Sequence, residues 1–200
     1  NLTNDNYDGY HIYNSEYQLS KDEIVERILN EKNIYITEHF VNGIFKHVNF
    51  DHKVQNLANF QTAMVHSSYI ESIVDNPKSI AKIIKDIEPI DTSLINKCIP
   101  LQKQSYERLE FLGDSILRHA IGKYLYNRYP TQDEGFLTTN RSKIENTNGL
   151  SKLSIRLGFH KYIIIDRHIE KSNGRITFPK IVEDVFEAFI GCLLYTSDAA

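Results

Sequence analysis

Two segments that carry acidic residues at helical spacing among apolar residues constrain the fold most strongly. In the first segment, 106–117, the acids are Glu107, Glu110 and Asp114. At about 100° per residue, these three side chains fall within an arc of roughly 60° on one face of a helix. Most neighbouring residues are Leu, Ile or Phe. The sequence therefore predicts a helix built for burial that nevertheless carries an acidic stripe.

The second segment, 181–194, repeats this arrangement near the end of the chain. Asp184 and Glu187 are three positions apart among apolar residues, and the segment contains no basic residue. Like charges at this spacing cost about 0.2–0.5 kcal/mol per pair when exposed, and burial costs more. The acidic faces of the two helices would be stabilised if they faced each other around a divalent cation. Because no Cys or His lies within the acidic stretches 107–114 and 184–187, oxygen ligation favours Mg²⁺ or Mn²⁺ over zinc.

A solvated helix face is the ordinary alternative to a metal site. On spacing alone, two or three acids on one face are more often a hydrated surface than a set of ligands. The apolar surroundings, and the repetition of the pattern on a second helix, favour the metal site.

Composition limits the class of protein and its partners. A chain of 200 residues with 41% hydrophobic residues can form one globular domain. The net charge of −3 excludes a strongly basic body that holds nucleic acid by charge alone. Cys98 and Cys192 show neither zinc-ligand spacing nor a disulfide framework, so we expect an intracellular, cytoplasmic protein. No apolar run approaches the length of a membrane span, so no membrane association is expected.

Helical periodicity and its interruptions predict an all-α domain over 20–194. Residues 1–19 read as a polar N-terminal arm, and the proline-interrupted stretch 71–105 reads as an insert with a short helix of its own. The β-branched run 162–166 has no visible partner strand and is interpreted as a buried connector. Residues 195–200 look like a truncated or non-native tail. Other helices are expected near 34–48 and 54–69, at about 105–128, between a turn at Gly135 and Gly158, and after Pro179.

Four stretches resemble the ribonuclease III family, in the family's order. ERLEFLGDSIL at 107–117 resembles its signature motif, and VEDVFEAFIG at 182–191 resembles its second acidic motif. LANFQTAMVHSSY at 57–69 is similar to a family helix that ends in a His-Ser pair, and 125–159 resembles the segment that joins the acidic motifs. The resemblance implies a helical bundle like the ribonuclease III endonuclease domain, and no double-stranded RNA-binding domain is recognisable in this chain.

The resemblance also implies roles for individual residues. It implies metal-binding carboxylates at four positions: Glu110, Asp114, Asp184 and Glu187. Of these, Asp114 and Glu187 are the expected catalytic residues. Glu107 matches an additional acid with a less direct role, and Phe111 matches an aromatic residue that inserts into the partner subunit at the dimer interface.

The activity that the resemblance implies is hydrolysis of double-stranded RNA. Members of the family are Mg²⁺-dependent endoribonucleases that leave 5′-phosphate and 3′-hydroxyl ends and act as two-fold dimers, so a homodimer is expected. A composition rich in Asn, Ile, Lys and Tyr, together with the insert, suggests a large DNA virus or a protist as the source. A viral enzyme would act in the host cytoplasm.

RNA contacts are expected from basic residues, because A-form RNA is recognised through phosphates and 2′-hydroxyls. The candidates are Arg141 and Lys143, followed by Lys171 and Arg175, with a solvated surface charge as the alternative for each. His66 is interpreted as a hydrogen-bonded packing residue rather than a catalyst.

Two other functions remain open at this point. A catalytically silent dimer that binds RNA or associates with the ribosome would keep the fold without the activity. A small enzyme that acts on structured ribosomal RNA without an RNA-binding domain would keep both. Magnesium-dependent cleavage of long duplex RNA separates the silent protein from an enzyme.

Overall fold

The computed structural model of the protein describes residues 23, 25, 29–71 and 96–197. Within these ranges the chain forms helices and connecting segments, and its only β-type pairings are two isolated bridges. The predicted all-α fold is therefore confirmed. Four expectations lie outside the described residues: the arm at 1–19, the domain start at residue 20, the short helix of the insert and the end of the tail. The described elements are α2 (Glu38–His47), α3 (Leu57–Thr62), η1 (Ser67–Tyr69), α6 (Glu107–Arg128), α7 (Glu134–Ile144), α8 (Thr147–Leu157), η3 (Phe159–Lys161), α9 (Arg167–Lys171), α10 (Gly174–Thr177) and α11 (Pro179–Ser197).

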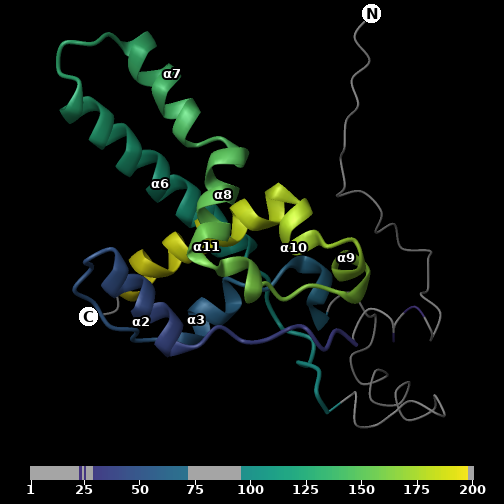
Figure 1. Ribbon diagram of the computed structural model, residues 1–200. Helices are drawn as coiled ribbons and strands as arrows, with labels where there is room; N and C mark the ends of the chain where they lie inside the picture. The colour runs from purple at the N-terminus through teal and green to yellow at the C-terminus, as the bar shows by residue number, and fades with distance from the viewer. Residues whose placement is uncertain (1–22, 24, 26–28, 72–95, 198–200) are drawn as a thin grey trace, which may run out of the picture.

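Helix α11 is the central element of the domain (Figure 1). Every residue over 181–189 is buried, the acids included. The Phe189 ring packs against Phe60 of α3 and Phe159 of η3, with centroids 5.2 and 4.6 Å apart. A helix that is apolar on most of its circumference is stable only in such a buried position. The acids of this helix are consequently carried into the interior.

Side-chain caps explain where several helices begin. Asp133 accepts a hydrogen bond from Phe136 N at 2.9 Å and starts α7, and Asn146 accepts one from Gly149 N at 2.9 Å and starts α8. Such caps satisfy backbone N–H groups that have no partner within the helix. The predicted turn at Gly135 is therefore wrong, because the cap places this residue inside the first turn of α7.

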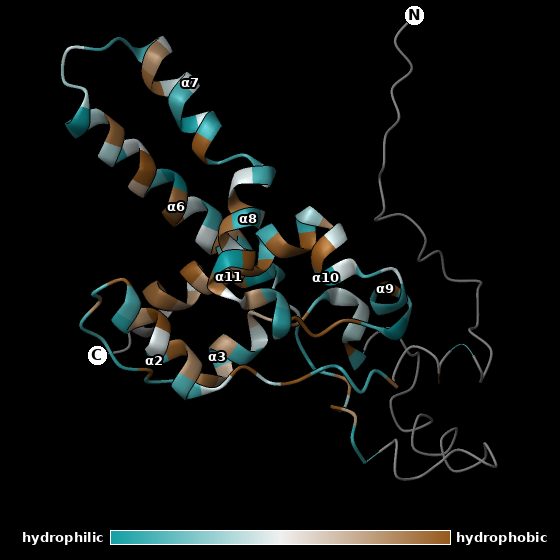
Figure 2. Cartoon of the chain, in the orientation of Figure 1, coloured by the Kyte–Doolittle hydropathy of each residue, from teal (hydrophilic) through white to brown (hydrophobic). Residues whose placement is uncertain are grey.

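Helix α6 has the predicted length but not the predicted burial. Gly113 and Leu125 are its buried residues, whereas the Tyr124 and Tyr126 side chains are 60% and 71% exposed. The second half of α6 runs outward beside α7 as a projecting hairpin (Figure 1). Figure 2 shows hydrophobic residues along this hairpin. The expectation of burial is wrong for the single chain, because α11 packs only against the first part of the helix (Figure 1).

A glycine contact joins α6 to α11. A Cβ atom at Gly113 would overlap the backbone carbonyl of Glu187, and one at Gly191 would overlap that of Leu109. Only a residue without a side chain permits two helix backbones to approach this closely. The contact brings the acidic residues of α6 beside those of α11.

The β-branched run forms a buried connector, as predicted. Ile163, Ile164 and Ile165 are fully buried between η3 and α9. Ile164 N donates to Met64 O at 2.8 Å, and His66 N donates to Ile164 O at 2.9 Å. These two hydrogen bonds form one of the isolated bridges rather than a sheet.

Candidate metal centre

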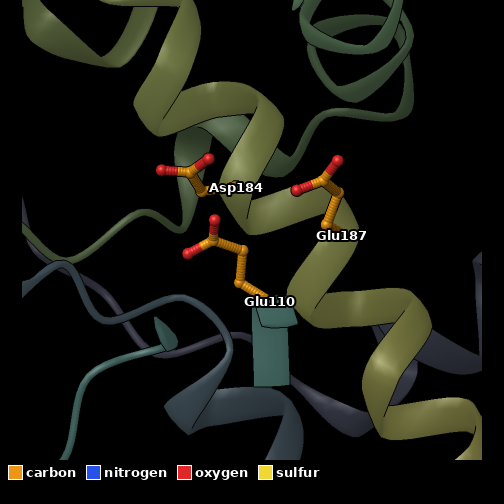
Figure 3. Close-up of side chains that lie close together, drawn as sticks. All are labelled: Glu110, Asp184 and Glu187. Carbon is orange, nitrogen blue, oxygen red and sulfur yellow. The ribbon is translucent and has the colours of Figure 1, made fainter. Parts of the chain in front are cut away.

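Three carboxylates from the two acidic segments converge beside the glycine contact. Glu110 projects from α6, and Asp184 and Glu187 project from α11 (Figure 3). One oxygen from each side chain lies within 4.8 Å of the other two. Asp184 and Glu187 are buried, while Glu110 is partly exposed. Oxygen donors at this spacing suit a hard divalent cation such as Mg²⁺ or Mn²⁺.

A cavity of about 490 Å³ is lined by two of these carboxylates, Glu110 and Glu187, and is bordered mainly by charged side chains. Its volume would admit a hydrated ion together with a phosphate group. The lining residues are Glu107, Glu110, Phe111, Asp114, Arg118, Ser142, Glu145, Lys180, Glu183 and Glu187.

Asp114 borders the cavity but lies outside the three-carboxylate cluster. Its Oδ1 accepts a hydrogen bond from Arg118 Nη2 at 2.9 Å, an ion pair between residues four positions apart on α6. The assignment of Asp114 as a ligand and catalytic residue stays a prediction. The same holds for Glu107 and for Phe111, whose side chain is 77% exposed at the rim.

Lys180 supplies a positive charge beside the acids of the second segment, which itself contains no basic residue. Its Nζ lies 2.6 Å from Asp184 Oδ1, 3.7 Å from Glu110 Oε1 and 3.6 Å from Glu183 Oε2. Helix α11 begins at Pro179, so Lys180 lies one turn before Glu183 and Asp184 on the same face. A divalent cation bound at Asp184 would therefore have to displace this ammonium group.

Two buried carboxylate oxygens, one in the three-carboxylate cluster and one beside it, fit a cation. Asp184 Oδ1 and Glu183 Oε2 have ion-pair contacts with Lys180 but no well-aligned hydrogen bond. Buried carboxylate oxygens in that state are stabilised by a metal ion, which needs no donor hydrogen. The residues placed to hold the ion are Glu110, Asp184 and Glu187.

Burial shifts the proton affinity of two of these ligands. It is the main cause that raises the pKa of Glu110 to about 7, and the charge of Asp184 adds to it. Burial likewise raises the pKa of Glu187 to about 7, with Glu183 as the largest contributing charge. Between the ordinary pKa of 4.5 and about 7, the folded metal-free protein thus holds protons that the unfolded chain has lost. The contribution of these two carboxyl groups to the folding stability of the metal-free protein is therefore present at low pH and is lost as the pH rises through 7.

Metal binding should accordingly strengthen as the pH rises from about 6.5 to 8.5. A cation binds ionised carboxylates, so each proton that must leave lowers the apparent affinity below the pKa. Calorimetric titration with Mn²⁺ should show tighter binding at the higher pH, while the melting temperature of the metal-free protein should fall. This window lies above the titration of His66, whose pKa burial lowers to about 4. An Mn²⁺ affinity that does not change with pH would contradict the proposed ligands.

The predicted RNA contacts fall into two groups. Lys143 and Lys171 are exposed. Arg141 is half-buried, with its Nε 3.9 Å from Glu145 Oε2. The RNA contacts of these three residues stay predictions. Arg175 is buried instead. Its guanidinium bonds to Glu170 Oε2 at 2.5 Å, to Asn33 Oδ1 at 2.8 Å and to a backbone carbonyl of the connector. Because these contacts engage the buried guanidinium, Arg175 has a structural role and is not available to contact phosphate.

His66 has the surroundings of a packing residue. Its Nδ1 accepts a hydrogen bond from Ser68 N at 3.1 Å, and its ring lies edge-on to Tyr106 with centroids 5.8 Å apart. These contacts agree with the interpretation made from the sequence.

The sequence reasoning missed three residues of the site. Lys180 lies one position before the acidic segment 181–194, although the expected helix start at Pro179 places it on the same helix. Glu183 is four positions before Glu187, which is a usable helical signal. Tyr106 precedes the helix and resembles any core aromatic residue, so nothing in the sequence indicated its hydrogen bond to Asp184.

Comparisons with known proteins agree with this geometry. Residues 107–198 match the family model "Ribonuclease III domain". The chain is 36% identical over 134 residues to "Probable ribonuclease 3" of Acanthamoeba polyphaga mimivirus, a match that covers 67% of this chain and 22% of that protein. It is 47% identical over 90 residues to "Ribonuclease 3" of Lactobacillus acidophilus, a match that covers 45% of this chain and 39% of that protein. The chain thus spans less than half the length of these relatives.

A solved structure shares the fold. The nuclease domain of ribonuclease III from Campylobacter jejuni superimposes with a TM-score of 0.55 at 22% identity, over 76% of this chain and 82% of that one. The family model includes both α6 and α11, whose carboxylates form the cluster. The matched domain and the curated relatives thus identify residues 107–198 as a ribonuclease III domain, and the solved structure shares its fold.

Proposed function

We propose that this chain is the catalytic part of an endoribonuclease that hydrolyses phosphodiester bonds in double-stranded RNA and depends on Mg²⁺, with Mn²⁺ as a substitute. The observation that carries the proposal is the convergence of Glu110, Asp184 and Glu187, with one oxygen of each within 4.8 Å of the others, in a ribonuclease III domain. The products would carry 5′-phosphate and 3′-hydroxyl ends.

The electrostatics of the cavity support a metal-dependent reaction. Its lining includes six carboxylates, which would repel a phosphodiester in the absence of added positive charge. When bound, a divalent cation would activate water and neutralise charge that develops on the phosphoryl group. The chain's own contribution is to hold the ligands in place, with Glu187 fixed on a buried helix and Glu110 beside it across the glycine contact.

A homodimer is part of the proposal. Phe111, Tyr124 and Tyr126 expose large apolar surfaces along one helix, as expected where a second copy packs. The structure from Campylobacter jejuni is described as flexible in a "region involved in dimer formation". The proposed location remains intracellular and cytoplasmic. Among the described helices, none combines the length and the hydrophobicity that crossing a membrane requires.

A cleavage assay with long duplex RNA tests the proposal. Purified protein should cut the duplex in Mg²⁺ and not in EDTA, and it should leave single-stranded RNA of the same sequence largely intact. Low salt is needed because a net charge of −3 gives a weak grip on RNA that falls further as salt rises. Ligation of the products without prior phosphorylation would identify 5′-phosphate ends. Duplex binding without cleavage would indicate the silent RNA-binding dimer instead.

A further inference from the structure

The hydroxyl group of Tyr106 contacts one of the three clustered carboxylates. Tyr106 Oη donates a hydrogen bond to Asp184 Oδ2 at 3.1 Å, and the pair is buried. A phenol beside an ionised carboxylate acts as the donor, because the carboxylate can only accept. This contact links residues 78 positions apart, at the start of α6 and on the first part of α11.

The Tyr106 side chain is held firmly by its surroundings. It is 1% exposed and belongs to the main hydrophobic core. Its backbone N–H donates to Val65 O at 2.8 Å, and its ring lies edge-on to His66. These contacts hold the Tyr106 ring in the core and place its hydroxyl against Asp184.

The two oxygens of Asp184 therefore have different environments. Oδ2 accepts from Tyr106, while Oδ1 lies 2.6 Å from the Lys180 ammonium, which is in turn 3.7 Å from Glu110 Oε1. Turning the carboxylate out of its present plane would break the Tyr106 hydrogen bond. The hydroxyl thus restrains the plane of the Asp184 carboxylate, with Oδ1 on the side of Lys180 and Glu110.

We propose that Tyr106 is a positioning residue of the metal centre, which presents Asp184 Oδ1 to the divalent cation through its hydrogen bond to Oδ2. The proposal rests on the metal site of the proposed function and adds to it a residue outside the four matched carboxylates. Groups that orient a ligand in this way typically change metal affinity by about 10- to 100-fold when they are removed.

Tyr106→Phe tests this role, because it keeps the buried ring and removes the hydroxyl. Calorimetric titration of the full chain with Mn²⁺ should show a dissociation constant raised about tenfold or more. In the RNA assay, the Mn²⁺ concentration for half-maximal cleavage should rise by a similar factor, while the rate at saturating Mn²⁺ stays close to that of the unchanged protein. A general structural defect would instead lower the rate at every Mn²⁺ concentration.

Tyr69→Phe is the matched control. Tyr69 is also fully buried, but its hydroxyl donates to Ile99 O at 2.7 Å, away from the carboxylates. This variant should bind Mn²⁺ as the unchanged protein does. Equal Mn²⁺ affinity in Tyr106→Phe and the unchanged protein, or an equal loss in both tyrosine variants, would overturn the positioning role alone. Failure of the unchanged protein to bind Mn²⁺ would overturn the metal site of the proposed function.

Discussion

Glu187→Gln is expected to lower the rate of duplex RNA cleavage by at least about 100-fold, the equivalent of about 2.7 kcal/mol of transition-state stabilisation. The substitution preserves the shape of the side chain but removes the charge that a divalent cation needs from its ligand. Glu187 is 6% exposed on the central helix and shares one cluster with Glu110 and Asp184. The measurement is single-turnover cleavage in saturating Mg²⁺, with circular dichroism to verify the helical content.

Glu38→Gln is the control for this variant. Glu38 is an exposed acid in the first turn of α2 and does not line the cavity. The same loss of one negative charge at that position should leave the cleavage rate unchanged. Undiminished cleavage by folded Glu187→Gln would show that this carboxylate does not take part in the reaction.

Gly113→Ala is expected to destabilise the protein by about 3 kcal/mol or more, at or beyond the upper end of typical overpacking costs. The added methyl group would overlap the backbone carbonyl of Glu187 on α11. Backbone atoms in a buried helix cannot move aside as a flexible side chain could, so α6 and α11 would have to separate. Urea denaturation followed by circular dichroism measures the change in the free energy of unfolding.

The same helix offers a matched control in Gly122→Ala. A Cβ atom at Gly122 would meet no other atom within 4 Å. Alanine is favoured over glycine in a helix by up to about 1 kcal/mol, so this variant should be equally stable or slightly more stable. If Gly113→Ala were as stable as Gly122→Ala, the close contact between α6 and α11 would be incorrect.

Local periodicity accounts for the part of the site that could be predicted from the sequence. The spacing of Glu110 on one helix, and of Asp184 and Glu187 on another, shows which side chains share a face. Because these acids repel one another and have apolar neighbours, the two faces were expected to meet around a cation. The structure brings these three carboxylates together.

Long-range contacts account for what could not be predicted. Arg175 lies in a turn that reads as exposed, yet its acceptors include Asn33, far away in the sequence. Tyr106 reaches Asp184 across a similar distance along the chain. The outward course of the second half of α6 depends on where its contact with α11 ends, and the periodicity within α6 does not show this (Figure 1).

Anomalous diffraction from crystals grown with Mn²⁺ tests most directly whether these carboxylates form a metal centre. The account predicts an anomalous peak in direct contact with oxygens of Glu110, Asp184 and Glu187. It also predicts that the Lys180 ammonium, now 2.6 Å from Asp184 Oδ1, has moved away because the two cations repel each other. A peak located elsewhere, or crystals in which Lys180 still pairs with Asp184 and no ion lies among the three carboxylates, would contradict the account.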